Sequence, residues 1–165
     1  MRRAGKRDDA RPRETDDPHA GEAASRQLPV LLHRTREALA MHFRKIFVLH
    51  DLTDPQWRVL RILSQVDEID VSHLARKSYL MRESLSRILR DLGGRGLILR
   101  RVSNTDARRF FHSLTPKGRS LLEEVSPALN PVYKEIEARF GVDRIEDLNK
   151  RLAELLAAIQ ISDDD

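Results

Sequence analysis

The chain has no cysteine, few aromatic residues and no long apolar run. Without cysteine it can form neither disulfides nor thiolate metal sites, and it has no cysteine nucleophile or redox sensor. Aromatic residues make up 5% of the 165 residues, so we expect an aliphatic core. No stretch approaches the ~18 apolar residues of a membrane span, and the charged N-terminus lacks the apolar segment of a secretory signal. We therefore expect one cytoplasmic domain with tails and no membrane partner.

Positive charge is concentrated in one segment. The chain has 30 Lys and Arg against 26 Asp and Glu, a formal net charge of +4. Residues 76–109 hold ten basic and three acidic residues and so carry +7, while the rest of the chain carries −3. Such a stretch is typical of a protein that binds a polyanion, although a solvated basic surface has the same charge pattern.

The termini and the middle of the chain differ in composition. Residues 1–26 mix charged residues, Pro, Gly and Ser without an apolar period, which predicts a disordered tail. Its seven basic and six acidic residues argue against a strong DNA-binding arm. Residues 162–165 form an acidic tail. Between the tails, apolar residues at helical spacing and capping signals predict six helices, which we place at 28–49, 54–65, 71–77, 82–92, 116–140 and 145–159. Pro127 and Pro131 predict a kink or break in the fifth of these helices.

The apolar period changes from 3.6 to 2 after the glycines at 93, 94 and 96. The alternating pattern predicts strands at residues 97–102 and 109–114, and residues 103–106 are of types that favour turns. The two strands are therefore predicted to form a hairpin with a basic, polar tip. Three helices followed by such a hairpin indicate a mainly α fold, the winged helix-turn-helix. The turn at 78–80 joins the helix-turn-helix pair, and the hairpin is the wing.

The helix over 82–92 is the candidate recognition helix. Its apolar residues are expected to face the core, which leaves Ser84, Arg87 and Asp91 exposed. Short hydroxyls allow a close approach to the major groove, and Arg can bind guanine through two hydrogen bonds. Taken alone, this helix could be an ordinary amphipathic surface helix, but the basic hairpin beside it favours DNA. The candidate DNA-binding residues are Ser72, Arg82, Ser84, Ser86, Arg87, Arg90, Arg100, Arg101, Asn104, Asp106, Arg108 and Arg109.

Asp106 is the exception in this set, because a carboxylate repels phosphate. Asp106 is expected to stabilise the hairpin or to orient an arginine. The alternative is that it is only a turn residue without a further role.

Two motifs carry a resemblance to a known family. The run Thr105-Asp106-Ala107-Arg108-Arg109 and the run Ser113-Leu114-Thr115-Pro116-Lys117-Gly118 resemble the wing and the following helix start of MarR-family transcription regulators. The resemblance covers roughly residues 28–161. It implies a homodimer on a pseudo-palindromic operator, usually a repressor that a small aromatic acid releases. It also implies that Arg108 reaches the minor groove.

The chain further resembles the branch of this family that regulates homoprotocatechuate and hydroxyphenylacetate genes. The residues that carry this are Arg36-Glu37-Ala38-Leu39, Leu52-Thr53-Asp54-Pro55-Gln56-Trp57-Arg58, Arg61 and Leu80-Met81-Arg82-Glu83-Ser84-Leu85. That branch usually has Pro where this chain has Glu83, so its DNA preference need not transfer. The resemblance implies an effector site built from Asp54, Trp57, Arg61 and Tyr133, closed by residues near Gln27, Arg36 and Phe43.

The spacing of three of these residues is compatible with such a site. Asp54, Trp57 and Arg61 stand at i, i+3 and i+7 and therefore share one helix face. An aromatic wall, a carboxylate and a guanidinium suit a hydroxyaryl acid. Each of these residues could also have a purely structural role. Trp57 could be a core aromatic, Asp54 a charge favoured by the helix dipole, and Arg61 a surface residue.

These predictions give a MarR-type domain over 27–161, with dimerisation helices at 27–50 and 116–161 and a winged helix-turn-helix at 53–115. We expect a dimeric regulator that binds double-stranded DNA sequence-specifically, a repressor released by a hydroxyaryl or heteroaryl carboxylic acid. Two alternatives are a winged-helix protein-interaction module and a DNA-binding regulator without a small-molecule effector. The sequence shows no phosphate loop, nucleophile elbow or catalytic carboxylate pair, and its six histidines have no metal-ligand spacing. We expect neither an enzyme nor a cofactor or metal.

Overall fold

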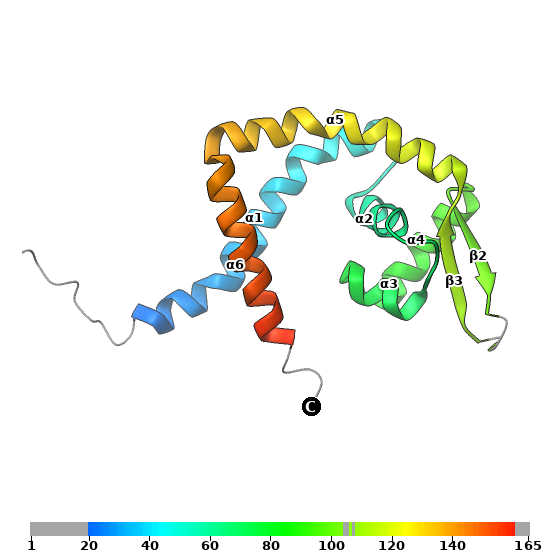
Figure 1. Ribbon diagram of the computed structural model, residues 1–165, viewed down its shortest axis with the longest axis horizontal. Helices are drawn as coiled ribbons and strands as arrows, with labels where there is room; N and C mark the ends of the chain where they lie inside the picture. The colour runs from blue at the N-terminus through cyan, green and yellow to red at the C-terminus, as the bar shows by residue number, and fades with distance from the viewer. Residues whose placement is uncertain (1–19, 104–105, 107, 161–165) are drawn as a thin grey trace, which may run out of the picture. The chain divides into compact units, whose positions relative to one another are not determined.

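The computed structural model describes residues 20–103, 106 and 108–160. Within these residues it has six helices and a small sheet, so the fold is mainly helical (Figure 1). The elements are α1 Ala20–Leu49, α2 Asp54–Leu63, β1 Ile69–Asp70, α3 Val71–Ser78, α4 Arg82–Gly94, β2 Ile98–Val102, β3 Phe110–Leu114, α5 Pro116–Phe140 and α6 Val142–Gln160.

The chain divides into two compact units, residues 1–39 and residues 40–165. The boundary falls inside α1, so the second unit contains the end of α1 and every later element. Across the described residues, no helix combines the length and the apolarity that a membrane span requires.

Local capping signals set the starts of the helices in the second unit. Thr53 and Gln56 form the predicted capping box of α2, in which the Thr53 backbone N–H donates to Gln56 Oε1 at 2.7 Å. Thr115 caps α5 by accepting a hydrogen bond from the Gly118 N–H at 3.0 Å. The short turn between α3 and α4 begins at Tyr79, which has a left-handed backbone with φ of 51°.

The hairpin of β2 and β3 is present as predicted, with Arg100 opposite His112. We call residues 98–114 the wing. The sheet has a third strand that the sequence did not predict, because β1 pairs antiparallel with β3 on the side away from β2. A two-residue strand carries no detectable period, so only the fold reveals it.

The structure corrects one prediction about the long helices and narrows another. α1 begins at Ala20, so residues 20–26 are helical and do not belong to the predicted tail; three of these seven residues are Ala, the strongest helix former. α5 is one continuous helix through Pro127 and Pro131, so the predicted break is absent, while a kink stays a prediction. Each proline removes one backbone hydrogen bond, and the buried side chains of Leu122, Val125 and Leu129 keep the stretch around Pro127 packed on the core. Residues 1–19 and the acidic tail at 162–165 lie outside the described residues.

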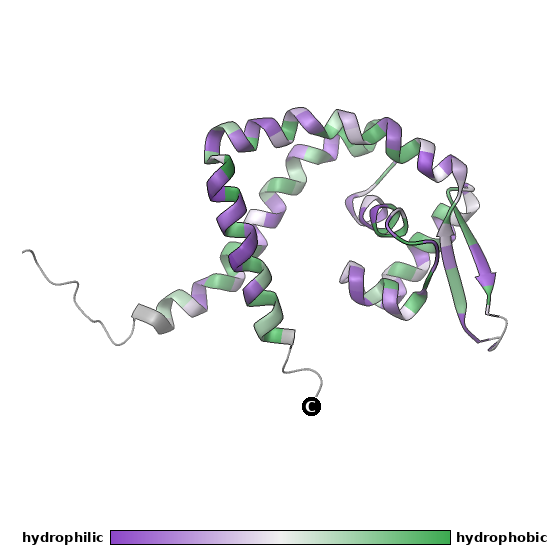
Figure 2. Ribbon diagram, in the orientation of Figure 1, coloured by the Kyte–Doolittle hydropathy of each residue, from purple (hydrophilic) through white to green (hydrophobic). Residues whose placement is uncertain are grey.

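The core of the second unit is aliphatic, as the composition predicted. Leu60, Leu63, Leu74, Leu85 and Leu92 are fully buried where α2, α3 and α4 meet. In contrast, hydrophobic and hydrophilic residues alternate along α6 (Figure 2), and none of its apolar side chains reaches full burial. The winged part of the fold is therefore well packed within one chain, while α6 leaves an apolar stripe in the open.

Candidate nucleic-acid interface

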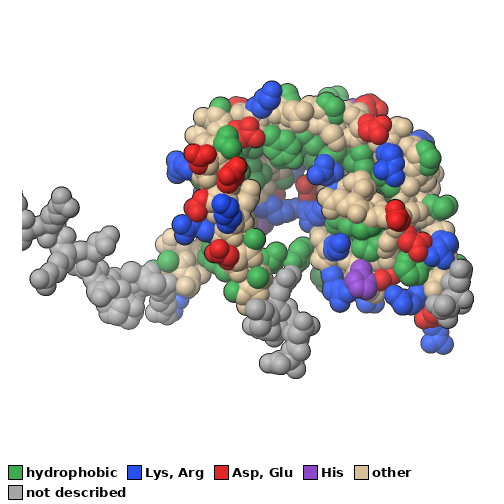
Figure 3. Space-filling view, in the orientation of Figure 1, with side chains coloured by type: hydrophobic (Ala, Val, Ile, Leu, Met, Phe, Trp, Pro, Cys, Tyr) green, Lys and Arg blue, Asp and Glu red, His purple; other side chains and the backbone are tan. Residues whose placement is uncertain are grey.

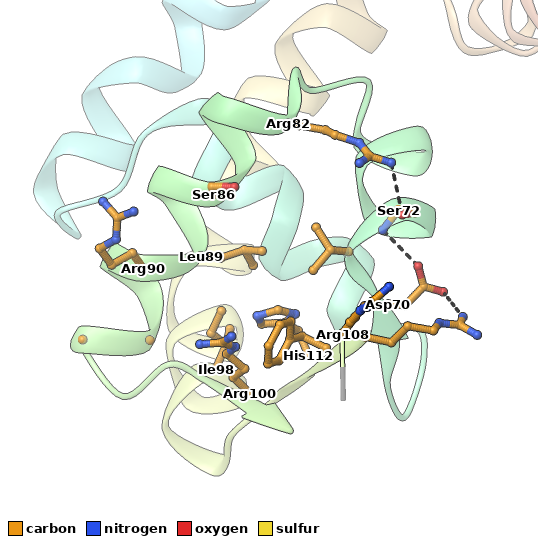
Figure 4. A pocket seen from close by; sticks show the side chains of 15 residues that line it. Asp70, Ser72, Arg82, Ser86, Leu89, Arg90, Ile98, Arg100, Arg108 and His112 are labelled. Atoms are coloured by element: carbon orange, nitrogen blue, oxygen red, sulfur yellow. Dashed lines mark hydrogen bonds and ion pairs between the residues drawn. The ribbon is translucent and has the colours of Figure 1, made fainter. Parts of the chain in front are cut away.

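A groove of about 640 Å³ lies between α4 and the wing. Figure 4 shows Arg82, Ser86 and Arg90 along α4, with side chains from the wing across from them. Its lining includes five arginines and a single carboxylate, Asp70, so we call it the basic groove. Lys and Arg side chains also gather over α3 and the strands in the space-filling view (Figure 3). The five arginines are Arg82, Arg90, Arg100, Arg108 and Arg109.

Aromatic rings hold two arginines on the wing side of the basic groove. The Arg100 guanidinium carbon lies 3.6 Å from the Phe110 ring centroid, and the Arg109 guanidinium carbon lies 5.7 Å from that of Phe111. Cation–π contacts at exposed sites contribute about 0.5–1 kcal/mol each. These side chains are therefore partly ordered in the absence of a partner, which lowers the entropy cost of binding an anion.

Arg101 does not reach the basic groove, although it was predicted to bind DNA. Side chains alternate across a strand, so Arg101 faces away from Arg100. It donates to both carboxylate oxygens of Glu68, at 3.1 and 2.6 Å. That hydrogen-bonded carboxylate raises the pKa of Arg101 further. The geometry indicates a residue that ties the wing to the segment before β1.

Asp70 joins the start of α3 to the wing. Its Oδ1 accepts hydrogen bonds from the backbone N–H groups of Ser72 and His73, at 2.9 and 3.1 Å. Its Oδ2 contacts His73 Nδ1 and lies 3.4 Å from an Arg109 nitrogen. Burial favours a higher pKa for this carboxyl, but the hydrogen bonds and charge of His73 and the Ser72 N–H outweigh it and lower the pKa. The sequence predicted the cap and missed the contact with the wing.

His112 forms part of the floor of the basic groove and is 4% exposed. Its Nδ1 is buried and makes no hydrogen bond with the part of the chain that the structure describes. Burial, and then the nearby charge of Arg100, lower the pKa of this imidazole. His112 is therefore neutral at pH 7. No role was predicted for His112, although side chains alternate in direction along a strand, so His112 had to face the side opposite to Phe111 and Ser113.

The predicted recognition positions of α4 fall into two groups. Ser86 and Arg90 line the basic groove, as does Arg82, whose Nη2 lies 3.4 Å from Ser72 Oγ. Ser84 and Arg87 are exposed and lie outside the groove lining.

At the wing tip, Asp106 Oδ1 accepts a hydrogen bond from the Arg108 N–H at 2.9 Å, and its carbonyl accepts one from the Arg109 N–H. Asp106 thus holds the turn, one of the two roles expected for it. Asn104 lies outside the described residues.

Four aromatic side chains form a ladder that joins α1, α2 and α5. Ring centroids are 5.1 Å apart for Tyr133 and Phe43, 6.2 Å for Phe43 and Phe47, and 5.6 Å for Phe47 and Trp57. Arg61 lies beyond Trp57, with its guanidinium carbon 6.0 Å from the indole centroid. The fold therefore links Tyr133, Phe43, Trp57 and Arg61 in one series of contacts, with Tyr133 and Arg61 at its opposite ends. The resemblance implied one effector site for these four residues.

Arg61 also borders a second groove, of about 330 Å³, between α2 and α5. Arg119, Glu123 and Ser126 of α5 line the same groove. An anionic group placed beside Arg61 would therefore meet a second guanidinium, and also one carboxylate.

Three further predicted effector residues are placed differently. Asp54 accepts a hydrogen bond from the Arg58 side chain at 2.8 Å, so its carboxylate is already engaged on α2. Gln27 and Arg36 belong to the other compact unit, residues 1–39, and both are exposed there. Within the described residues, no three His, Asp or Glu side chains come together in a way that could hold a metal ion.

Comparisons with known proteins bear on the family and the fold of this chain. The model of the MarR family matches residues 52–110. The homoprotocatechuate degradative operon repressor of Escherichia coli is 35% identical over 130 residues, which cover 79% of this chain and 88% of that protein.

Among solved structures, NadR in complex with 4-hydroxyphenylacetate is 36% identical, with a TM-score of 0.69 over 78% of this chain and 91% of that one. A mutant of Escherichia coli MarR complexed with operator DNA has a TM-score of 0.72 over 78% of this chain and 93% of that one. At 21% identity, this second structure supports the fold alone.

Proposed function

This chain belongs to the MarR family of DNA-binding transcription regulators, which are not enzymes, and from that premise we propose that it is a dimeric repressor released by an aromatic carboxylic acid. The observation that carries the DNA part is the basic groove, where five arginines from α4 and the wing surround a concave surface. Neutralising phosphates with such side chains releases counterions and supplies most of the affinity of a DNA-binding protein.

The two elements that flank the basic groove, α4 and the wing, suit different parts of duplex DNA. The exposed face of α4, with Ser84 and Arg87, enters the major groove, where an arginine reads guanine through two hydrogen bonds. Arg108 at the wing tip reaches the minor groove, whose negative potential attracts arginine. Arg100, held on Phe110, is placed to bind phosphate.

DNA binding is tested by fluorescence anisotropy with a duplex from upstream of the protein's own gene and a scrambled duplex. We expect the native duplex to bind more tightly, and affinity to fall by roughly 10³–10⁵ between 50 and 200 mM salt, as for a protein with 6–10 phosphate contacts. Arg108→Ala should weaken binding, whereas Arg139→Ala on α5, which removes the same charge from a residue paired with Glu135, should not. A flat salt dependence with equal binding to both duplexes contradicts the proposal and favours a protein-interaction module.

The aromatic ladder and Arg61 support the effector part of the proposal. Tyr133 is about half exposed, so its ring and hydroxyl remain available to a ligand. Arg61 and Arg119 offer guanidinium groups that suit a carboxylate. One relative's solved structure contains 4-hydroxyphenylacetate, and another relative represses homoprotocatechuate degradation. A hydroxyphenyl carboxylic acid that binds between these groups therefore fits the chemistry of the chain.

The effector is tested by titrating 4-hydroxyphenylacetate into the protein–DNA complex. We expect release of DNA, and by reciprocity weaker ligand binding when operator DNA is present. Arg61→Ala should weaken ligand binding and leave DNA affinity without ligand unchanged, while Arg151→Ala on α6 serves as the charge-matched control. Unchanged ligand affinity in Arg61→Ala refutes this site, and no response to any aromatic acid favours a regulator without an effector.

Dimerisation is proposed from the apolar side chains left exposed on α1 and α6. Leu31 and Leu39 on α1 and Leu148, Leu156 and Ile159 on α6 are all more than a third exposed. Contiguous apolar faces that are left exposed mark interaction surfaces. A second copy of the chain would cover these faces symmetrically. In such a dimer, the two α4 helices bind half-sites about one turn of DNA, ~34 Å, apart.

A further inference from the structure

The outermost face of α4 carries an acidic side chain with no partner. Glu83 stands in the first turn of α4, is exposed, and makes no hydrogen bond or ion pair with the residues that the structure describes. The acidic side chains of the basic groove, of the end of α4 and of the wing tip are engaged: Asp70 with Arg109, Asp91 with Gln56, and Asp106 with the Arg108 backbone. Among these four described carboxylates, Glu83 is the one that is free to meet an outside group.

The position of Glu83 on the helix places it at the apex of that surface. Glu83, Arg87 and Arg90 are spaced i, i+4 and i+7, so they share one helix face. The buried residues Leu85 and Leu89 lie on the opposite face. Arg90 is at the edge of this exposed face that borders the basic groove. Glu83 and Arg87 thus point away from the protein body, from the end of the helix that enters the major groove first in helix-turn-helix complexes.

A carboxylate on the DNA-facing surface of α4 opposes DNA binding unless it accepts a hydrogen bond from the DNA. It repels phosphates, so it cannot contribute to backbone contacts. In the major groove, cytosine presents the N4 amino group as a donor, and Glu accepts from that group. Adenine also has an amino donor, but its N7 acceptor lies next to it and repels a carboxylate.

Resting on the proposed function, we propose that Glu83 determines specificity by accepting a hydrogen bond from a cytosine N4 amino group in each operator half-site. Arg87, one turn further along the same face, reads a neighbouring guanine. Glu83 adds no affinity for DNA in general, because its charge opposes the phosphate field. Its effect is confined to the choice of base at one symmetric pair of positions.

Two substitutions at this position and one control elsewhere separate base reading from other roles. Glu83→Gln keeps the length of the side chain and offers a donor beside an acceptor, which matches adenine N6 and N7. Glu83→Asp keeps the carboxylate in the first turn, and with it the favourable interaction with the helix dipole, but shortens its reach. Glu146→Gln on α6 is the matched control, since it removes an exposed charge from a helix outside the winged part of the fold.

The experiment is selection from a randomised duplex library with the wild type and the three variants, followed by anisotropy on single-base variants of the selected site. We expect the wild type to prefer cytosine at one position of each half-site by roughly 5- to 100-fold, the range for a good base contact. Glu83→Gln should shift that position to adenine, Glu83→Asp should lose the preference, and Glu146→Gln should keep the wild-type site. Because Glu83 is exposed and makes no side-chain contact, Glu83→Asp should unfold at the wild-type temperature, whereas Glu83→Gln, which loses the interaction of the charge with the helix dipole, should melt lower by no more than a few degrees.

Two outcomes overturn the inference while leaving the proposed function intact. If Glu83→Gln selects the same site as the wild type, Glu83 does not read a base. If Glu83→Gln instead loses a guanine preference, Glu83 acts by orienting Arg87, and the direct contact is wrong. A wild type that selects no sequence at all refutes the proposed function itself.

Discussion

Asp70 offers the sharpest test of how the wing is attached to the helix-turn-helix. Its carboxylate caps α3 and also contacts Arg109 on the wing. Asp70→Asn keeps a side-chain oxygen that can cap the helix but removes the charge. Asp70→Ala removes both. Comparing the two variants therefore separates the cap from the ion pair.

The structure sets the expected magnitudes. Replacing an N-cap Asp by Ala costs about 1 kcal/mol, within a range of roughly 0.5–2. The pair with Arg109, whose side chain is 53% exposed at a separation of 3.4 Å, adds at most about 1 kcal/mol. We expect Asp70→Ala to lower the free energy of unfolding by roughly 0.5–3 kcal/mol in total, and Asp70→Asn by about 1 kcal/mol or less, because Asn is a good N-cap.

Urea unfolding followed by tryptophan fluorescence measures both values. Trp57 is the single tryptophan of the chain and is 8% exposed, so its emission reports loss of the core. Equal destabilisation by the two variants would refute the reasoning, because it would mean that the charge of Asp70, and not the cap, holds this region.

The pH dependence provides a second check on the same residue. The pKa of Asp70 is lowered in the folded state, so the stability that its charge contributes is fully present above the ordinary Asp pKa of about 3.9. That contribution is lost as pH falls through the lowered folded pKa. The difference in stability between the wild type and Asp70→Asn should therefore shrink below about pH 4. A difference that persists unchanged at low pH contradicts this account.

DNA binding by Asp70→Asn should change in the opposite direction from stability. The substitution removes the single carboxylate from the lining of the basic groove and releases Arg109 from its pair. Affinity for a scrambled duplex should rise. The plot of log affinity against log salt concentration should become steeper by the amount expected for about one additional phosphate contact. Weaker binding to the scrambled duplex would mean that Arg109 needs its contact with Asp70 in order to reach DNA.

Three further predictions concern stability and assembly. Because the pKa of His112 is lowered in the folded state, the unfolded chain takes up a proton at this residue at a higher pH than the folded chain does. The stability of the wild type should therefore fall as pH drops below about 6.5, and urea unfolding of His112→Leu should not show that dependence. Gly118→Ala would place a Cβ 2.2 Å from the Leu97 carbonyl oxygen, so it should lower stability by about 1–3 kcal/mol and the Tm by several degrees in a thermal melt. Leu156→Glu on α6 should shift the protein from dimer to monomer in sedimentation, and a wild type that sediments as a monomer would contradict the proposed dimer.

Features that depend on residues close together in the chain could be predicted before the fold was known. The capping box of Thr53 and Gln56, the Asp70 cap and the Thr115 helix start were all readable, because each signal spans at most four residues. The wing was readable from its change of period and its turn chemistry. Together with the MarR-like motifs, these local signals were enough for the winged fold.

The tertiary structure decided the features that depend on residues far apart in the chain. Glu68 binds Arg101 and Asp70 contacts Arg109, across 33 and 39 positions, and both contacts follow from the pairing of β1 with β3, which has no local signature. The passage of α5 through Pro127 was likewise set by packing and not by propensity. The charge of each residue follows from the sequence, but which arginine lines the basic groove and which is bound to a carboxylate follows only from long-range contacts.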